Sequence, residues 1–280
     1  MIKNKAHSIK ARLLNLSVGD NKKYQRLVTR YLHERFLFRL SRSQFSNNFI
    51  LKGGALLYVY EQYLPRPTWD VDFLGINICM DKNVIIRAFK DIVLIQINDG
   101  IKFIPETIEA STIGKNGIRI TVVATLDTIR QKLIYDIGFG DIITPYPLII
   151  DYSTIFAEDR FRLKAYSLET VISEKLQTIV EKGMNNSRMK DFFDLYRIIL
   201  MNHFDEEILL MAIRITFQNR KTDLSAGALL FTPEFATDPS FQNRWIAFCK
   251  KIEINNPPSF EETVKTITDF IKPFLPKAKP

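Results

Sequence analysis

Residues 51–75 read LKGGALLYVYEQYLPRPTWDVDFLG, and the order of features in this stretch predicts the fold. Gly53 and Gly54 follow a short apolar run, and the segment after them has the composition of a helix. Asp70 and Asp72 come next and alternate with apolar residues, as in a strand. Because side chains two positions apart in a strand point to the same side, we expect these two carboxylates to lie together.

The expected carboxylate pair is a candidate metal site. Two like charges repel each other in a poorly solvated place, and a divalent cation removes this conflict. Hard oxygen ligands suit Mg²⁺, which proteins commonly hold through one or two carboxylates together with substrate phosphates. The alternative is a surface strand with two solvated aspartates, which is the commoner origin of an isolated Asp-x-Asp pattern.

The glycines before the pair favour the metal-site interpretation. Glycines at the start of a helix let backbone N–H groups approach a phosphate, and the helix dipole favours the anion. A glycine pair, a helix and an Asp-x-Asp strand in this order are similar to the signature of polymerase-β-like nucleotidyltransferases. Asp136, in LIYDIGFG on a further expected strand, is the candidate for a third carboxylate; alternatively, it prepares the turn at residues 138–141.

The hydrophobic pattern predicts an α+β protein. Residues 1–48 and the part after about residue 165 have helical periodicity, with loops expected near 220–240. The part between them, residues 49–155, reads as a mixed sheet with flanking helices. The clearest expected elements are a helix, ALLYVYEQYL (55–64), and three strands, WDVDFLG (69–75), GIRITVVATL (117–126) and KLIYDIGFGD (132–141).

Composition and charge exclude few classes of protein. The 280 residues carry a net charge of +8, which weakly favours nucleic acid or nucleotide phosphates as a partner, although ordinary basic solubility fits equally well. Two distant cysteines fit a reducing cytosol. The start, MIKNKAHSIKARLL, lacks a signal-peptide core and no apolar run approaches a membrane span, so we expect a cytoplasmic protein without membrane contact. The absence of HExxH, GxSxG and P-loop motifs argues against zinc proteases, serine hydrolases and P-loop enzymes.

The segment YSLETVISEKLQTIVEKG predicts a helix from about residue 168 to 182. Lys175 falls inside its apolar stripe, which consists of Leu168, Val171, Ile172, Leu176 and Ile179. An inward lysine is unusual unless it meets an anion or its charged end reaches water. Lys175 is therefore either a cation that reaches a triphosphate or a member of a structural ion pair.

The next segment, NNSRMKDFFDLYRIIL, places three charged residues near the start of another expected helix. Asp191 and Asp194 are three positions apart, and Arg188 precedes Asp191 by about one turn. They form either a polar cluster that faces a cleft or a salt-bridged helix start, and the residues alone favour the second.

Several motifs together resemble one known family, the AbiEii/AbiGii nucleotidyltransferase toxins. These are the toxin half of type IV toxin–antitoxin pairs that act in abortive infection, a phage defence, and the mycobacterial MenT toxins are related to them. The resemblance covers most of the chain and rests on YLHERFLFRLSRS, FILKGGALL, RPTWDVDFLG, IYDIGFGD, YSLETVISEKL, NNSRMKDFFDL and AIRITFQNRKT. It implies two lobes: N-terminal helices with a nucleotidyltransferase lobe (residues 1–160), and a mainly helical lobe (residues 161–280).

The resemblance also implies roles for individual residues. The expected catalytic residues are Asp70, Asp72, Lys175 and Asp191, with Lys190 beside the last. The expected nucleotide-binding residues are Lys52, Gly53, Gly54, Arg66, Thr68, Lys175 and Arg188, and the expected metal ligands are Asp70, Asp72 and Asp136. Either Asp136 or Asp191 takes the third acidic role. Two positions depart from the family pattern: Trp69 precedes the first aspartate, and Ala55 follows the glycines where many polymerase-β-like enzymes have serine.

The expected activity is a transfer that depends on Mg²⁺ or Mn²⁺. A nucleoside monophosphate would pass from a nucleoside triphosphate to an RNA acceptor, for which the 3′ end of tRNA is the first candidate. Such a toxin would block translation and growth and would be neutralised by a cognate antitoxin. The alternatives are transfer to a protein or small molecule, or a non-catalytic relative that binds nucleotide or RNA.

Overall fold

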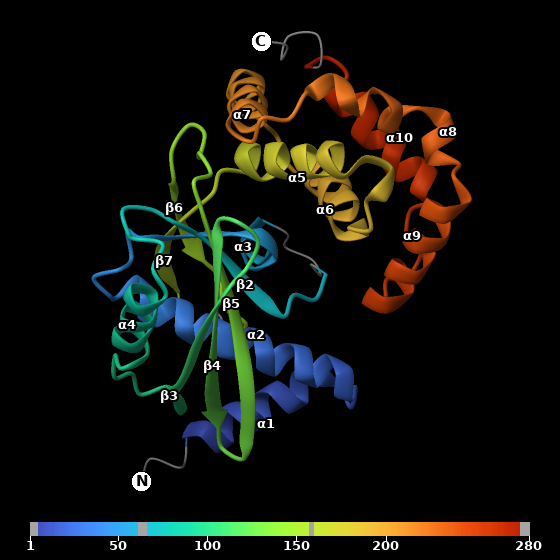
Figure 1. Ribbon diagram of the computed structural model, residues 1–280. Coiled ribbons are helices and arrows are strands. Elements are labelled where there is room, and N and C mark those ends of the chain that lie inside the picture. Colours follow the sequence, from blue (N-terminus) through green and yellow to red (C-terminus); the bar gives the residue numbers. More distant parts are fainter. Residues whose placement is uncertain (1–4, 61–65, 157–159, 275–280) are drawn as a thin grey trace. The chain divides into compact units, whose positions relative to one another are not determined.

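The computed structural model describes residues 5–60, 66–156 and 160–274 (Figure 1). The chain divides into two compact units. Unit 1 consists of Met1–Gly140 and Leu148–Ala165, and unit 2 consists of Asp141–Pro147 and Tyr166–Pro280. Within the described ranges, no helix is both long enough and apolar enough to span a bilayer.

Unit 1 is built on a mixed sheet with the strand order β3-β4-β5-β2-β1-β7-β6. Its strands are β1 (Phe49–Lys52), β2 (Asp70–Gly75), β3 (Ile101–Thr112), β4 (Gly117–Leu126), β5 (Ile129–Phe139), β6 (Leu148–Tyr152) and β7 (Phe161–Ala165). The central strand β2 pairs in parallel with β5 and antiparallel with β1. The expected α+β class, with a mixed sheet and flanking helices, is confirmed.

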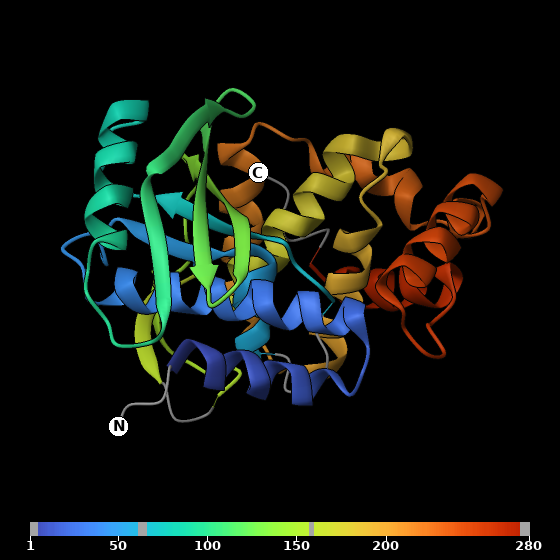
Figure 2. The ribbon, with the colours of Figure 1, turned by 90° about the horizontal axis from the view of Figure 1, so that it is seen from below.

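Helices cover one face of this sheet. They are α1 (Lys5–Ser17), α2 (Asn21–Ser41), α3 (Gly53–Tyr60) and α4 (Lys82–Val93). Figure 2 shows α2 lying across the strands. Phe36 of α2 packs against Tyr135 of β5 and Phe89 of α4, with ring centroids 4.2 and 5.1 Å apart. The core therefore lies between this face of the sheet and helices α2 and α4.

The alternation predicted for β2 is confirmed. Val71 and Phe73 are fully buried, whereas Asp70 and Asp72 are half-buried on the other face. Because Phe73 and Tyr135 lie side by side in the core, their strand neighbours Asp72 and Asp136 project away from it. The buried face of the sheet thus fixes the direction in which the carboxylates point.

Several other expected elements are confirmed, and some strands were not expected. The predicted strand over residues 117–126 is β4, and the predicted helix over 168–182 is α5 (Leu168–Lys182). The helix after the glycines already begins at Gly53, and the last residues of its predicted range, 61–64, lie outside the described part. Strand β3 escaped prediction because Pro105 and a shift in register between Ile104 and Glu109 interrupt its alternation. An edge strand tolerates such a proline.

Unit 2 is mainly helical. Besides α5, it contains the 3₁₀ helix η1 (Gly183–Asn185), α6 (Met189–Met201), α7 (Glu206–Asn219), the 3₁₀ helix η2 (Leu224–Phe231), α8 (Pro233–Ala236), α9 (Pro239–Ile252) and α10 (Phe260–Ile271). The expectation of loops near 220–240 was partly wrong, since short helices occupy most of that range. Thr232 caps α8 by accepting a hydrogen bond from the N–H of Phe235, and Pro233 suits the first helical position.

Candidate active site

The glycine turn between β1 and α3 lies directly against the carboxylate pair. Gly53 has φ +67°, in the left-handed region that favours glycine. A Cβ atom at Gly53 would lie 2.0 Å from Oδ2 of Asp72. Only glycine therefore allows the turn and the carboxylate to approach each other this closely.

The second glycine lies against two predicted nucleotide-binding residues. A Cβ atom at Gly54 would lie 2.7 Å from Oγ1 of Thr68 and 3.4 Å from a terminal guanidinium nitrogen of Arg66. The Thr68 hydroxyl donates to Oδ1 of Asp70 over 3.2 Å. Thr68 thus links the turn to the first aspartate, and the Arg66 guanidinium group lies close to Gly54.

Three carboxylates converge on this place. Asp70, Asp72 and Asp136 each offer an oxygen atom, and these oxygens lie within 4.8 Å of one another. Asp72 and Asp136 are direct partners in the parallel ladder of β2 and β5. Asp136, one of the candidates for a third carboxylate, thus lies beside the pair. The cluster fits a hard divalent cation, because its donors are carboxylate oxygens on two adjacent strands.

Cations flank the carboxylates along a row that crosses four strands. Lys52 of β1 lies opposite Asp72, which lies opposite Asp136, which in turn lies opposite Arg119 of β4. Cross-strand partners share a face of the sheet. Across the four strands the row therefore consists of a cation, two carboxylates and a second cation.

Arg119 was not predicted from the sequence. Its Nε donates to Oδ1 of Asp136, and a terminal nitrogen donates to Oδ2, each over 2.7 Å. Hydrogen bonding to Asp136 raises the pKa of Arg119, and the charges of Asp136, Asp70 and Asp72 add to the shift. A signal was present, because Arg119 alternates with the apolar residues Ile118 and Ile120 and so had to share the face of the carboxylates.

A buried histidine supports the start of β2 from the core side. The Nε2–H of His33 donates to the backbone carbonyl of Trp69 over 3.3 Å. Burial lowers the pKa of His33 to about 4, against the opposite effects of this hydrogen bond and of the Asp70 charge. The ring is therefore neutral near pH 7 and fixes the backbone immediately before the carboxylate pair. No pattern in the sequence indicated this contact.

A second predicted group assembles in unit 2. Nζ of Lys175 lies 3.1 Å from Oδ1 of Asp191 and 2.6 Å from Oδ2 of Asp194. Arg188 reaches Oδ2 of Asp191 over 2.5 Å. Both carboxylates are almost fully buried, with 2% and 1% of their side chains exposed. The structure thus shows Lys175 in ion pairs with two carboxylates and a salt bridge between Arg188 and Asp191 at the start of α6.

The charges in this group stabilise the ionised form of Asp191. Burial alone would raise the pKa of the Asp191 carboxyl, but Lys175 and Arg188 lower it well below its usual range. Next to the group, Arg220 pairs with Glu174 over 3.1 Å and donates to Asp141 over 3.0 Å. Arg220 belongs to the motif AIRITFQNRKT, whose structural role the sequence did not reveal.

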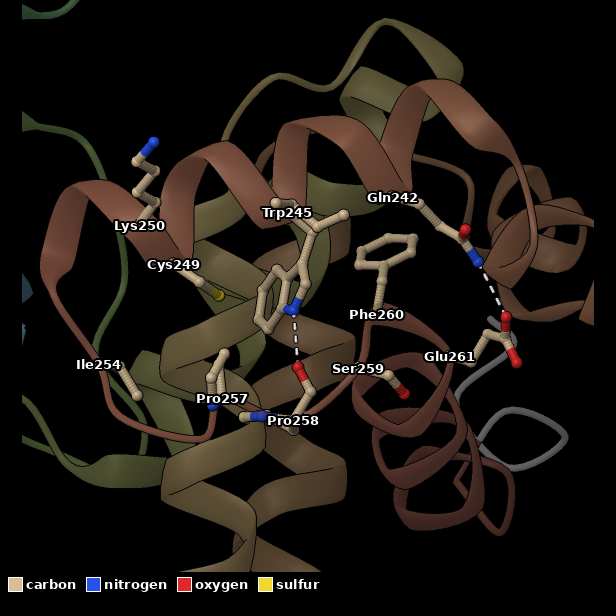
Figure 3. A pocket seen from close by; sticks show the side chains of 11 residues that line it. Gln242, Trp245, Cys249, Lys250, Ile254, Pro257, Pro258, Ser259, Phe260 and Glu261 are labelled. Carbon is tan, nitrogen blue, oxygen red and sulfur yellow. Dashed lines mark hydrogen bonds between the residues drawn. The ribbon is translucent and has the colours of Figure 1, made fainter.

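A cavity of about 550 Å³ lies elsewhere in unit 2, between α9 and the start of α10. Figure 3 shows the rings of Trp245 and Phe260 beside it, and the indole Nε1–H of Trp245 donates to the carbonyl of Pro258 over 2.8 Å. None of the residues that line it was predicted as a site residue. Its lining lacks a group of convergent charges.

Comparisons with known proteins give one family and two solved structures of similar fold. The model of the family described as "Nucleotidyl transferase AbiEii toxin, Type IV TA system" matches residues 35–266. The structure resembles that of JHP933 from Helicobacter pylori, with a TM-score of 0.54, 18% identity, and coverage of 91% of this chain and 93% of that one. It also resembles a "putative nucleotidyltransferase from H. pylori", with a TM-score of 0.53, 17% identity, and coverage of 91% and 96%. A search of the curated proteins found no significant match.

Proposed function

The chain belongs to the nucleotidyl transferase AbiEii toxin family of type IV toxin–antitoxin systems, and from this membership we propose that it transfers a nucleoside monophosphate to RNA. The family implies a nucleoside triphosphate as the donor and an antitoxin as a partner. The observation that carries the proposal is the convergence of Asp70, Asp72 and Asp136 beside the glycine turn. The net charge of +8 is compatible with a polyanionic acceptor such as tRNA.

In the proposed reaction, an acceptor hydroxyl oxygen forms a bond to the α-phosphorus of the triphosphate. The bond from that phosphorus to the bridging oxygen breaks, and pyrophosphate leaves with the electron pair. Asp70, Asp72 and Asp136 would hold Mg²⁺ or Mn²⁺, which supplies charge stabilisation at the attacking and leaving oxygens. The acceptor gives up its proton to water or to a carboxylate of the site.

The other residues of unit 1 have roles that follow from their positions. Gly53 and Gly54 begin α3, whose first backbone N–H groups and helix dipole would favour a phosphate there. Arg66 and Lys52 would neutralise charge on the phosphates, and the Thr68 hydroxyl would orient Asp70. Unit 1 is accordingly the proposed nucleotidyltransferase lobe.

For unit 2, we propose that Lys175 and Arg188 contact nucleotide phosphates and that Asp191 positions them. Support comes from the resemblance of SEKL and RMKDFFD to the family motifs, and from the ion pairs that join the three residues. Asp191 is a poor proton acceptor, because its pKa is lowered and two cations hold it. Its proposed role is therefore electrostatic.

The test is transfer of label from each of the four α-³²P nucleoside triphosphates to total RNA. We expect the wild-type protein to label RNA with Mg²⁺ and to stop when EDTA is added. The double variant Asp70→Asn/Asp72→Asn should be inactive, whereas Asp151→Asn, which removes an exposed carboxylate of the same unit, should be active. If the label appeared in a protein or a small molecule instead, the acceptor would not be RNA. Equal label with wild-type protein and the double variant would contradict the proposal.

The biological setting is part of the same proposal. We propose that the protein acts in the cytoplasm, where nucleoside triphosphates and tRNA are available. Modification of tRNA would block translation and growth, and a cognate antitoxin would neutralise the effect. Sequencing of RNA 3′ ends after brief expression should show added nucleotides on the acceptor, and these should be missing when the double variant is expressed.

A further inference from the structure

Arg119 binds both carboxylate oxygens of a candidate metal ligand, Asp136. Its guanidinium group donates to both oxygens of Asp136, each over 2.7 Å. A bidentate pair of this kind is among the stronger hydrogen-bonded ion pairs in proteins. One of these oxygens is also the atom that Asp136 would offer to a divalent cation shared with Asp70 and Asp72.

We propose that Arg119 competes with the divalent cation for Asp136 and thereby weakens metal binding in the nucleotide-free protein. The inference rests on the metal site proposed above and concerns how that site is regulated. A triphosphate is the kind of anion that can draw the guanidinium away, because arginine binds phosphate through the same planar pair of donors. Asp136 then becomes free to act as a metal ligand when substrate is present.

The exposure of Arg119 is consistent with a guanidinium group that can dissociate from Asp136. Its side chain is 40% exposed, so the guanidinium group can reach solvent without crossing packed core. Arg39 provides a contrast within the same unit. It makes a similar bidentate pair with Asp99, but both side chains are only 3% exposed. That pair is locked into the core, whereas the pair of Arg119 and Asp136 lies at the edge of the site.

The ion pair of Arg119 and Asp136 is not needed to hold β4 and β5 together. The ladder between β4 and β5 runs without interruption from Gly117 opposite Gly138 to Leu126 opposite Ile129. Buried apolar residues alternate along both strands, and a slip by one residue would expose them, so the ladder resists such a slip without the ion pair. The charges at Arg119 and Asp136 are therefore available for another purpose.

The charges at the site indicate that Arg119 and a divalent cation compete for Asp136 and do not support each other's binding. A guanidinium group on Asp136 places a positive charge beside the position of the cation, and like charges repel at this range. Replacing Arg119 by glutamine removes both the repulsion and the competing hydrogen bonds. We expect a roughly fivefold lower dissociation constant for Mn²⁺, which corresponds to about 1 kcal/mol for a partly exposed pair.

The experiment measures binding of Mn²⁺ alone by electron paramagnetic resonance, without nucleotide and without reference to activity. Arg119→Gln should bind Mn²⁺ about five times more tightly than wild-type protein, and Arg119→Lys should be intermediate. The matched control is Lys132→Gln, which removes a cation from an exposed pair with Glu109 on the same sheet and should bind like wild type. Circular dichroism checks that each variant is folded.

The outcomes separate this inference from the proposed function. Equal or weaker Mn²⁺ binding by Arg119→Gln would overturn the competition, since Arg119 would then position Asp136 for the metal. Equal tightening by Lys132→Gln would also overturn it, because the effect would then be one of net charge. If Asp70→Asn/Asp72→Asn bound Mn²⁺ as tightly as wild type, the metal site itself would be wrong, and the proposed function would fail with the inference.

Discussion

Replacing Gly53 by alanine tests whether the glycine turn and the carboxylate pair form one site. Gly53 has φ +67°, and a Cβ atom there would lie 2.0 Å from Oδ2 of Asp72. A methyl group therefore adds two perturbations at once. The backbone must tolerate a left-handed alanine, and the carboxylate must move away from the turn.

The two effects have different magnitudes and different readouts. A left-handed conformation costs an alanine residue about 1 to 2 kcal/mol of folding free energy. The carboxylate must move by about 1 Å or more to reach ordinary van der Waals separation. Since a misplacement of about 1 Å at a catalytic site can cost about 100-fold in rate, we expect nucleotide transfer to fall by about that factor.

Gly19→Ala is the matched control. Gly19 has φ +81°, and a Cβ atom there would meet nothing within 4 Å. Both variants should lose a similar folding free energy in urea titrations followed by circular dichroism. Only Gly53→Ala should lose Mn²⁺ binding and transfer of labelled nucleotide. If Gly53→Ala bound Mn²⁺ and transferred nucleotide like Gly19→Ala, the turn would not belong to the site.

Two further predictions concern buried charges. The pKa of His33 is about 4 in the folded protein against an ordinary 6.5, so the unfolded chain takes up the proton at a higher pH than the folded chain. Acidification from pH 7 to 5 should therefore lower the free energy of unfolding by about 2 kcal/mol. His33→Gln should lose that part of the pH dependence in urea titrations, and an unchanged slope would contradict it. Lys175→Met leaves the buried Asp191 and Asp194 without their shared cation and should cost about 3 kcal/mol at pH 7. The loss should shrink at pH 5 as a carboxylate takes up a proton, and a pH-independent loss would point to packing instead.

The features that follow from local pattern could be predicted from the sequence. The alternation of β2 directs Asp70 and Asp72 to one face because Val71 and Phe73 must be buried. The helical stripe around Lys175 likewise directs that lysine inward. In both cases the periodicity of the element decides the direction of the side chain, so no tertiary information was needed.

The features that depend on register could not be predicted. Arg119 lies opposite Asp136, but this pairing requires knowledge of which residues of β4 and β5 face each other. The contact of His33 with the carbonyl of Trp69 joins α2 to the residue before β2, 36 positions away. A single sequence shows which residues are present but not which of them lie close together in the fold. The pattern alone therefore could not distinguish Arg119 and His33 from solvated residues.

The most direct test of the account is the position of a bound metal. Crystals grown with Mn²⁺ and a non-hydrolysable nucleoside triphosphate would give an anomalous difference map that locates the ion. We predict a peak about 2.1 Å from carboxylate oxygens of Asp70 and Asp72, with the triphosphate against Gly53 and Gly54. A well-ordered nucleotide bound elsewhere, with no anomalous peak at these carboxylates, would contradict the central claim.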